Sequence, residues 1–112
     1  MVALAAKRYG VPFYVCAPTS TIDMGTETGA GIVIEQRKPA EVTDMWYKEP
    51  MVAEGIKVYN PAFDVTDADL ITGIVTEYGI AYPPYNQSFR DIFLKKEIRE
   101  KVEEIVDRLE TE

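Results

Sequence analysis

The sequence contains no histidine, a single cysteine and no long uninterrupted run of apolar residues. Histidine is the commonest transition-metal ligand and the usual general base near neutral pH, so acid–base chemistry would fall to carboxylates, tyrosines, lysines or Cys16. One cysteine excludes an intrachain disulfide framework. Because a transmembrane helix needs about 20 predominantly apolar residues, we expect a protein that does not span a membrane. We therefore predict a soluble, cytoplasmic protein.

Positive charge is also scarce in this chain. Lysine and arginine number 12 against 19 aspartates and glutamates, which gives a formal net charge of −7. Nonspecific binding to nucleic acid needs a basic surface, so we expect no nucleic-acid partner. The apolar fraction of 46% is ordinary for a globular protein. A length of 112 residues suits one domain or part of one.

The N-terminal residues predict a helix followed by a strand. Residues 1–9 are helix formers, and Gly10 is a natural helix stop. No capping residue precedes them, so either the natural helix begins further upstream or a short helix frays at a true N-terminus. The apolar run 11–17 predicts a strand buried on both faces of a parallel sheet. Cys16 lies in that run and is interpreted as a buried, structural thiol rather than a reactive one.

Three hydroxyl side chains, Thr19, Ser20 and Thr21, come directly after this strand. Ligands bind at the carboxyl ends of strands in open parallel sheets, so the hydroxyls are candidates to hold a phosphate or a sugar hydroxyl. The alternative is that they satisfy the backbone of their own loop. The sequence leaves both interpretations open.

A second informative stretch runs from Asn60 to Glu77. The β-prone residues 56–59 predict a strand that ends at Pro61, which cannot donate to a ladder. Asp64 follows in the loop and either orders it by accepting backbone amides or faces a pocket. Thr66 and the acidic residues after it form a helix-start pattern. We predict a helix over residues 67–78, whose inward stripe would be Leu70, Ile71, Ile74, Val75 and Tyr78, with Gly79 closing it.

Weaker patterns predict the remaining elements. Residues 32–37 suggest a short strand, 39–42 one helical turn, and 80–82 an edge strand blunted by the two prolines that follow. A long amphipathic helix is predicted from Ser88 to the C-terminus, and it packs either on its own domain or in a partner's groove. Its apolar residues recur at intervals of three or four: Leu94, Ile98, Val102, Ile105 and Leu109.

Several separated blocks resemble, in the same order, the C-terminal region of the methylthioribose-1-phosphate isomerases. They are residues 5–23 (AAKRYGVPFYVCAPTSTID), 34–37 (IEQR), 41–42 (EV) and 60–77 (NPAFDVTDADLITGIVTE). The superfamily also contains the α, β and δ subunits of translation initiation factor two-B and the ribose-1,5-bisphosphate isomerases. The likeness covers residues 2–82, and the tail from Pro83 departs from the family.

The resemblance implies an α/β fold with a Rossmann-like C-terminal domain, a mostly parallel sheet flanked by helices, and dimers formed through that domain. Residues 1–82 would be part of this domain, and residues 83–112 a linker and the amphipathic helix. It also implies an aldose–ketose isomerase of methionine salvage that uses no metal or organic cofactor. Such enzymes act on a sugar phosphate with a cysteine and an aspartate.

The segments that carry that cysteine and aspartate are absent from this sequence, and Cys16 does not match the catalytic position. No catalytic residue can therefore be assigned here. The expectation is a C-terminal portion that is inactive alone and works with the N-terminal part of the same enzyme. The alternatives are a non-catalytic regulatory or assembly module, as in the initiation-factor branch, and a segment of a ribose-1,5-bisphosphate isomerase. The sequences of residues 18–23 and 60–77 are closer to the methylthioribose-1-phosphate isomerase branch than to the regulatory subunits.

Overall fold

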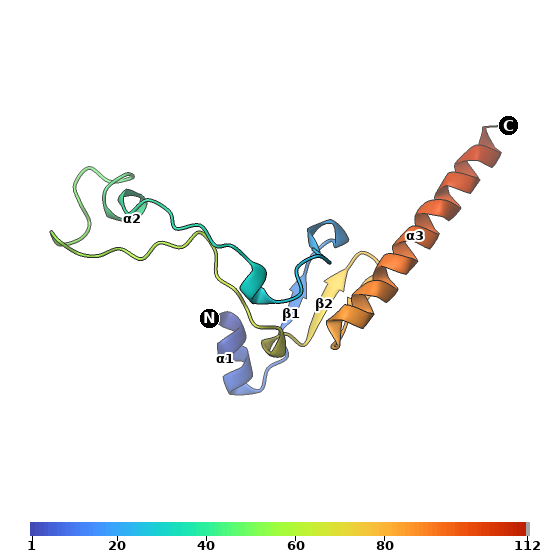
Figure 1. Ribbon diagram of the computed structural model, residues 1–112, viewed down its shortest axis with the longest axis horizontal. Coiled ribbons are helices and arrows are strands. Elements are labelled where there is room, and N and C mark those ends of the chain that lie inside the picture. Colours follow the sequence, from blue (N-terminus) through green and yellow to red (C-terminus); the bar gives the residue numbers. More distant parts are fainter. Residues whose placement is uncertain (112) are drawn as a thin grey trace. The chain divides into compact units, whose positions relative to one another are not determined.

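A computed structural model describes residues 1–111 of the chain. These residues form two compact units, which are described separately. The first unit combines Met1–Gly25 with the residues from Thr66 onward, and the second is Thr26–Val65. Figure 1 traces the path of the chain through both. The division predicted after residue 82 separates the C-terminal helix from the rest and stays a prediction.

The first unit begins with helix α1, Val2–Tyr9, as predicted. Gly10 ends the helix in the left-handed region with φ 67°. Only glycine adopts that conformation without steric cost, which explains why the helix stops there. The next amide, that of Val11, donates to the carbonyl of Ala6 at 2.9 Å and turns the chain toward the first strand.

A sheet of three strands, in the order β1-β2-β3, forms the centre of this unit within the described residues (Figure 1). Strand β1, Tyr14–Cys16, pairs in parallel with β2, Gly73–Thr76. Strand β3, Gly79–Ala81, pairs with β2 in antiparallel fashion. The predicted α/β class is confirmed. The described sheet is mixed, however, and a mostly parallel, Rossmann-like sheet is not confirmed.

The helix predicted over residues 67–78 is wrong. A short 3-10 turn, Ala68–Leu70, is followed by strand β2 and a tight turn into β3. The apolar spacing fits a helix, but all of residues 71–76 except Gly73 are β-branched. Such side chains favour strands, and glycine disfavours a helix interior. A short apolar run cannot be assigned from its period alone, and here the β-branched composition decided.

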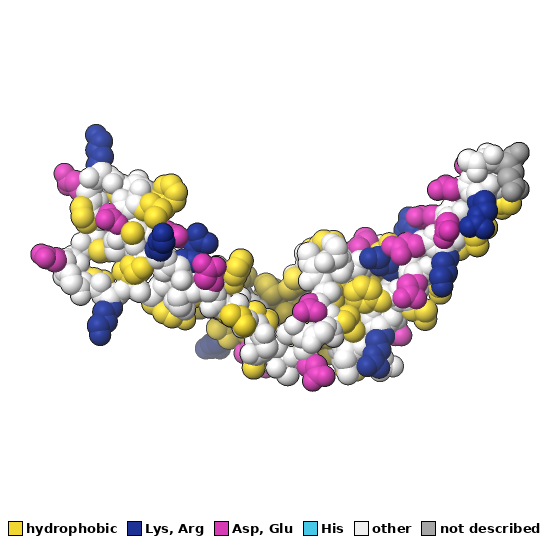
Figure 2. Space-filling view, turned by 45° about the horizontal axis from the view of Figure 1, so that its top comes forward, with side chains coloured by type: hydrophobic (Ala, Val, Ile, Leu, Met, Phe, Trp, Pro, Cys, Tyr) yellow, Lys and Arg dark blue, Asp and Glu magenta, His cyan; other side chains and the backbone are white. Residues whose placement is uncertain are grey.

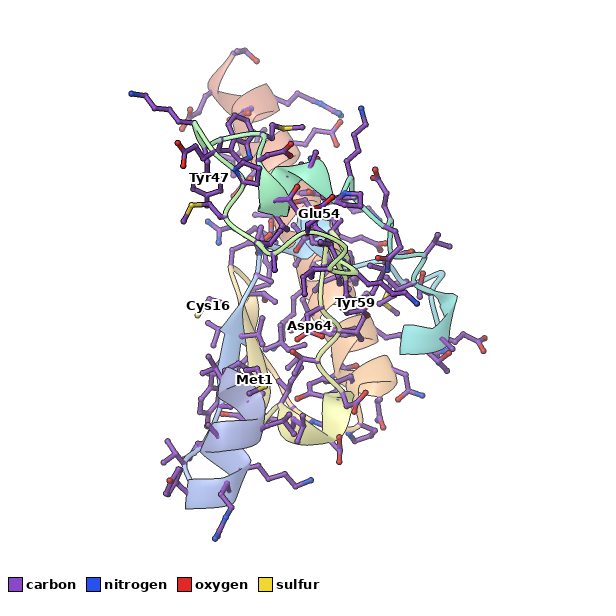
Figure 3. The ribbon with its side chains drawn as sticks, turned by 90° about the vertical axis from the view of Figure 1, so that its left-hand side faces the viewer. Met1, Cys16, Tyr47, Glu54, Tyr59 and Asp64 are labelled. Carbon is purple, nitrogen blue, oxygen red and sulfur yellow. The ribbon has the colours of Figure 1, made fainter. Side chains whose placement is uncertain are left out.

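Strand β1 lies at one edge of the sheet, and among residues 1–111 its only neighbouring strand is β2. Tyr14 and Cys16 are exposed, and only Val15 between them is partly covered. The predicted burial of this strand on both faces, and of the Cys16 thiol, is therefore wrong for the described chain. Figure 3 shows the Cys16 sulfur pointing away from the strand.

Helix α3, Tyr85–Glu110, confirms the predicted C-terminal helix but begins three residues before Ser88. Its first turns attach it to the sheet. Ile92 is 3% exposed, and the rings of Tyr85 and Phe89 stack with centroids 5.7 Å apart. The Tyr85 hydroxyl donates to the carbonyl of Ile71 at 2.7 Å. The Ser88 hydroxyl does not cap the helix and donates to the carbonyl of Tyr82 at 2.7 Å.

No helix among residues 1–111 combines the length and the apolar content that a membrane crossing requires.

The second unit, Thr26–Val65, contains little regular structure. Helix α2, Ala40–Thr43, confirms the predicted turn, and Gly29–Gly31 form a 3-10 turn. The strands predicted over 32–37 and 56–59 are absent from the described residues, apart from an isolated bridge at Gln36. This bridge joins Gln36 and Pro61, with backbone hydrogen bonds of 2.8 Å from the Arg37 amide to the Asn60 carbonyl and from the Ala62 amide to the Glu35 carbonyl. Pro61 lacks an amide hydrogen to extend the ladder, which explains why the pairing stays this short.

The turn between β2 and β3 depends on Gly79, whose φ of 124° is rarely adopted by side-chain-bearing residues. We predict that Gly79→Ala lowers the free energy of unfolding by roughly 1–3 kcal/mol, because alanine is strained in that conformation. Chemical denaturation followed by circular dichroism measures the change. Gly25→Ala is the matched control, since Gly25 has an ordinary φ and its added methyl group would meet only the exposed side chain of Asp23. Equal losses in both variants would contradict the prediction.

Candidate functional site

The carboxyl ends of β1 and β2 lie at the same edge of the sheet because the two strands are parallel. Beyond Cys16, the amide of Ala17 still donates to the carbonyl of Val75 at 2.9 Å, so the pairing continues to the end of β1. A 3-10 turn, Thr19–Thr21, follows β1 there, and Glu77 follows β2. This edge therefore gathers three hydroxyls and one carboxylate from segments that lie far apart in the sequence.

Glu77 fastens the two strand ends together. Its carboxylate oxygens accept the backbone amide of Thr19 at 2.9 and 3.1 Å, and the Thr19 hydroxyl donates to one of them at 2.5 Å. Thr19 is buried, at 2% exposed, whereas Glu77 is exposed to solvent. Hydrogen bonds to an ionised acceptor are shorter and stronger than neutral ones. The link spans 58 residues of sequence and fixes the start of the Thr19–Thr21 turn.

The hydrogen bond from the Thr19 hydroxyl is the main reason why the pKa of Glu77 lies below its ordinary value. Backbone amides and the positive charge of Lys96, on helix α3, act in the same direction. A helix over residues 67–78 was predicted, and Glu77 would have been near its end. The helix is absent, and the partner is a threonine rather than a basic side chain in direct contact. Glu77 is therefore a carboxylate held in its ionised form.

The three predicted hydroxyls have different surroundings. The Thr19 hydroxyl is bonded to Glu77, and the Thr21 hydroxyl donates to the carbonyl of Pro18 at 2.8 Å. Both therefore satisfy their own loop, one of the two interpretations that the sequence left open. Ser20 is exposed, and within the described residues its hydroxyl makes no hydrogen bond. Of the three, Ser20 is the hydroxyl free to reach a ligand.

The fourth candidate, Asp64, belongs to the unit Thr26–Val65, whereas the hydroxyls belong to the other unit. Whether Asp64 shares a site with the hydroxyls stays a prediction. Asp64 is exposed and is the last residue but one of its unit; Figure 3 labels its position. Whether it faces a pocket stays a prediction.

Glu77 is the residue of this edge whose role sequence reasoning missed. The spacing between Glu77 and Thr19 in the sequence does not predict their contact, since the two residues lie in different segments. The one available signal was the β-branched composition of residues 71–76, which would have placed Glu77 after a strand rather than in a helix. Among the described residues, no group of three or more Cys, Asp and Glu side chains is arranged to hold a metal ion.

The fold and this edge define an α/β protein in which a polar loop at the carboxyl ends of parallel strands is held in place by a carboxylate. Residues 1–83 match the family described as the Initiation factor 2 subunit family. The chain belongs to this family, and the resemblance found across residues 2–82 is thereby confirmed.

Individual relatives carry a more specific description. The chain is 65% identical over 100 residues to a methylthioribose-1-phosphate isomerase from Symbiobacterium thermophilum, which covers 89% of this chain and 28% of the relative. It is 57% identical over 93 residues to the enzyme of that name from Thermosipho africanus, covering 83% of this chain and 27% of the relative. The chain thus spans about a quarter of the length of the curated relatives it matches.

Two solved structures share the fold. A 5-methylthioribose 1-phosphate isomerase from Pyrococcus horikoshii superposes with a TM-score of 0.74 at 41% identity, covering 83% of this chain and 26% of that one. The delta subunit of translation initiation factor eIF-2B from A. fulgidus superposes with a TM-score of 0.72 at 40% identity, covering 81% and 26%.

The Glu77–Thr19 link makes the stability of the fold depend on pH. Because the folded chain lowers the pKa of Glu77 from 4.5, the ionised carboxylate stabilises the fold above about pH 4.5. That contribution is lost as the pH falls through the lowered pKa. We predict that Glu77→Gln destabilises the chain at about pH 6, and that the difference in unfolding free energy shrinks by about pH 3. Urea titrations across this range measure it. The exposed Glu49→Gln exchange is the control, and a difference for Glu77→Gln that does not change with pH would contradict the prediction.

Proposed function

We propose that this chain is the C-terminal portion of an isomerase that converts methylthioribose 1-phosphate to methylthioribulose 1-phosphate in methionine salvage. The observation that carries the proposal is the 65% identity to a relative of that name over 89% of the chain. The solved isomerase that superposes with a TM-score of 0.74 supports it further.

The chemistry of the described residues supports a contribution to binding rather than to proton transfer. Moving a hydrogen between neighbouring carbons of a sugar needs a general acid and a general base whose pKa values lie near the working pH. The chain has no histidine, and Glu77 is bonded to Thr19 and held ionised. The acid–base pair therefore comes from the remainder of the enzyme, and the chain alone is inactive.

The substrate of the complete enzyme is a sugar phosphate, whose hydroxyl and phosphate oxygens need hydrogen-bonding groups. The Thr19–Thr21 turn offers the unoccupied Ser20 hydroxyl at the strand edge where ligands of open sheets bind. The proposed partners of the chain are the N-terminal part of the enzyme, which supplies the acid–base pair, and a second copy of the complete enzyme. The proposal includes no cofactor.

A second candidate function is a regulatory or assembly module of the initiation-factor branch. The observation that favours it is the eIF-2B delta subunit, which superposes almost as well as the isomerase and at a similar identity. Such a module would need no acid–base pair, and it would use the same strand edge only to bind or to assemble.

An isomerase assay on methylthioribose 1-phosphate separates the two candidates. We predict no turnover with this chain alone and turnover when the N-terminal part of the isomerase from Symbiobacterium thermophilum is added as a separate polypeptide. Circular dichroism of the chain alone and size-exclusion chromatography of the mixture are the controls. Turnover by the chain alone would contradict the claim that the chain lacks the acid–base pair. An assembled but inactive mixture would favour the regulatory module.

The Ser20 hydroxyl provides a test within the active mixture. We predict that Ser20→Ala lowers kcat/KM about 3- to 10-fold, the effect of losing one neutral hydrogen bond to the substrate, and leaves the unfolding midpoint unchanged. Thr28→Ala is the matched control, because Thr28 is exposed and its side chain forms no cap bond. Steady-state kinetics on both variants decide, and identical kcat/KM values for Ser20→Ala and the unmodified chain would remove Ser20 from the site.

A further inference from the structure

The Thr19–Thr21 turn lies at an edge of the sheet that its own segments leave without positive charge. Residues 9–25 and 66–89, which contain the three strands and the turn, include no lysine or arginine. Their charged residues are all acidic: Asp23, Asp67, Asp69 and Glu77. Proteins hold phosphate groups chiefly with arginine and lysine side chains. These two segments therefore lack the side chains that suit a phosphate best.

The basic side chains of this unit lie on two helices. Lys7 and Arg8 belong to α1 and the others to α3, along which Figure 2 shows lysine and arginine side chains. The last turn of α1 leads into the start of β1, and Lys7 contacts Asp69, ahead of β2, at 3.2 Å. Parallel strands begin at one edge of a sheet and end at the other, so the basic end of α1 lies at the edge opposite the turn.

Lys96, on α3, is the basic residue whose charge acts on Glu77. The hydrogen bond from the Thr19 hydroxyl lowers the pKa of Glu77 most, and Lys96 lowers that pKa least. The Lys96 ammonium also lies 3.9 Å from the carboxylate of Glu100, on its own helix. Within residues 1–111, Glu77 forms no ion pair. The one cation that acts on this edge is thus shared with a second carboxylate, and the edge keeps the negative charge of Glu77.

The Glu77 carboxylate has room for a further donor. Its Oε1 accepts the Thr19 amide at 3.1 Å and the Thr19 hydroxyl at 2.5 Å, and its Oε2 accepts the same amide at 2.9 Å. An ionised carboxylate offers about four acceptor positions. Glu77 is exposed to solvent, so the remaining capacity is open to a ligand. A ligand group that donates a hydrogen bond is therefore favoured beside Glu77.

Ser20 follows Thr19 directly and offers the second contact. Its exposed hydroxyl, unbonded within the described part of the chain, can donate or accept a hydrogen bond. A sugar hydroxyl also donates and accepts, so it can accept from Ser20 and donate to Glu77. A phosphate group instead carries one to two negative charges and mainly acceptor oxygens. It would meet the Glu77 carboxylate as a like charge with no proton to donate.

We propose that the Thr19–Thr21 turn binds a hydroxyl group of the sugar and excludes the phosphate group of the substrate. The proposal rests on the proposed function, because it concerns the substrate of the complete isomerase. Ser20 and Glu77 contact the sugar, and Thr19 positions Glu77. The cations that hold the phosphate then come from the remainder of the enzyme. The assignment decides between the two ligands that the sequence left open for these hydroxyls.

Inhibition of the active mixture by two pieces of the substrate tests this assignment. Methylthioribose has the sugar hydroxyls without the phosphate, and inorganic phosphate has the charge without the sugar. Ser20→Ala should raise the Ki of methylthioribose about 3- to 10-fold, the effect of one lost neutral hydrogen bond, and change the Ki of phosphate less than about twofold. The exposed Thr28→Ala exchange is the matched control and should change neither Ki.

Glu77→Gln tests the contribution of the carboxylate. Glutamine keeps an acceptor oxygen for Thr19 and removes the negative charge. The Ki of methylthioribose should rise, because a neutral amide oxygen is a weaker acceptor, and the Ki of phosphate should stay the same or fall. Circular dichroism checks that the variant is folded. An equal rise of both Ki values would show a general disturbance of the turn and would overturn the role given to Glu77.

Nuclear magnetic resonance of the complete chain alone gives a readout that needs no turnover. The amide resonances of the Thr19–Thr21 turn are followed while methylthioribose or sodium phosphate is added at tens of millimolar and constant ionic strength. Methylthioribose should shift the Ser20 resonance in a saturable way, and phosphate should leave it in place. Ser20→Ala should weaken the response of the neighbouring resonances to the sugar.

Three outcomes would overturn the proposal. They are a Ser20 resonance that responds to phosphate, a turn that responds to neither ligand, and a Ki of methylthioribose that Ser20→Ala leaves unchanged. An unmodified mixture without turnover would contradict the proposed function alone. In that case the titration of the chain by itself still decides whether the turn binds a sugar hydroxyl or a phosphate.

Discussion

The carboxylate of Glu77, bonded to the amide and hydroxyl of Thr19, is the contact on which the polar edge of this structure depends. It joins the end of β1 to the turn after β2, two segments that the chain separates by 58 residues. The bonds are charge-assisted and lie against a buried threonine, so they hold the Thr19–Thr21 turn more firmly than neutral loop contacts would. The single unoccupied hydroxyl of that turn, Ser20, owes its position to this link.

The described chain covers its apolar surface unevenly. Only Ala3, Ala81 and Ile92 are buried apolar residues within it, whereas β1 and the outer side of α3 stay open. A chain that spans about a quarter of its relatives is expected to expose surfaces that other polypeptide covers. Two kinds of exposed surface result. The edge strand β1 lies within residues 1–83, and the exposed apolar residues of α3 lie beyond them: Leu94, Ile98, Val102, Ile105 and Leu109.

Sequence reasoning succeeded where local signals are strong and failed where the apolar spacing and the side-chain composition favour different structures. Helix α1 with its glycine stop, strand β1 and the long helix α3 follow from composition and spacing alone. The stretch after Asp67 failed because its apolar spacing fits a helix while its β-branched side chains fit a strand. The position of Thr19, Ser20 and Thr21 after a strand was predictable. The carboxylate that orders them was not, because a contact between distant segments leaves no periodic trace.

The sequence by itself determined the family, the chemistry that is missing and the amphipathic character of α3. These properties reside in residue identity and in repeats of a few positions, which the chain carries before it folds. Only the tertiary structure decided that Glu77 meets Thr19, that Ser20 is the hydroxyl left unbonded and that α3 buries Ile92 while Ile98 stays exposed. Those outcomes depend on which strands pair and which helix face the sheet buries, and hydrogen bonds between remote segments fix both.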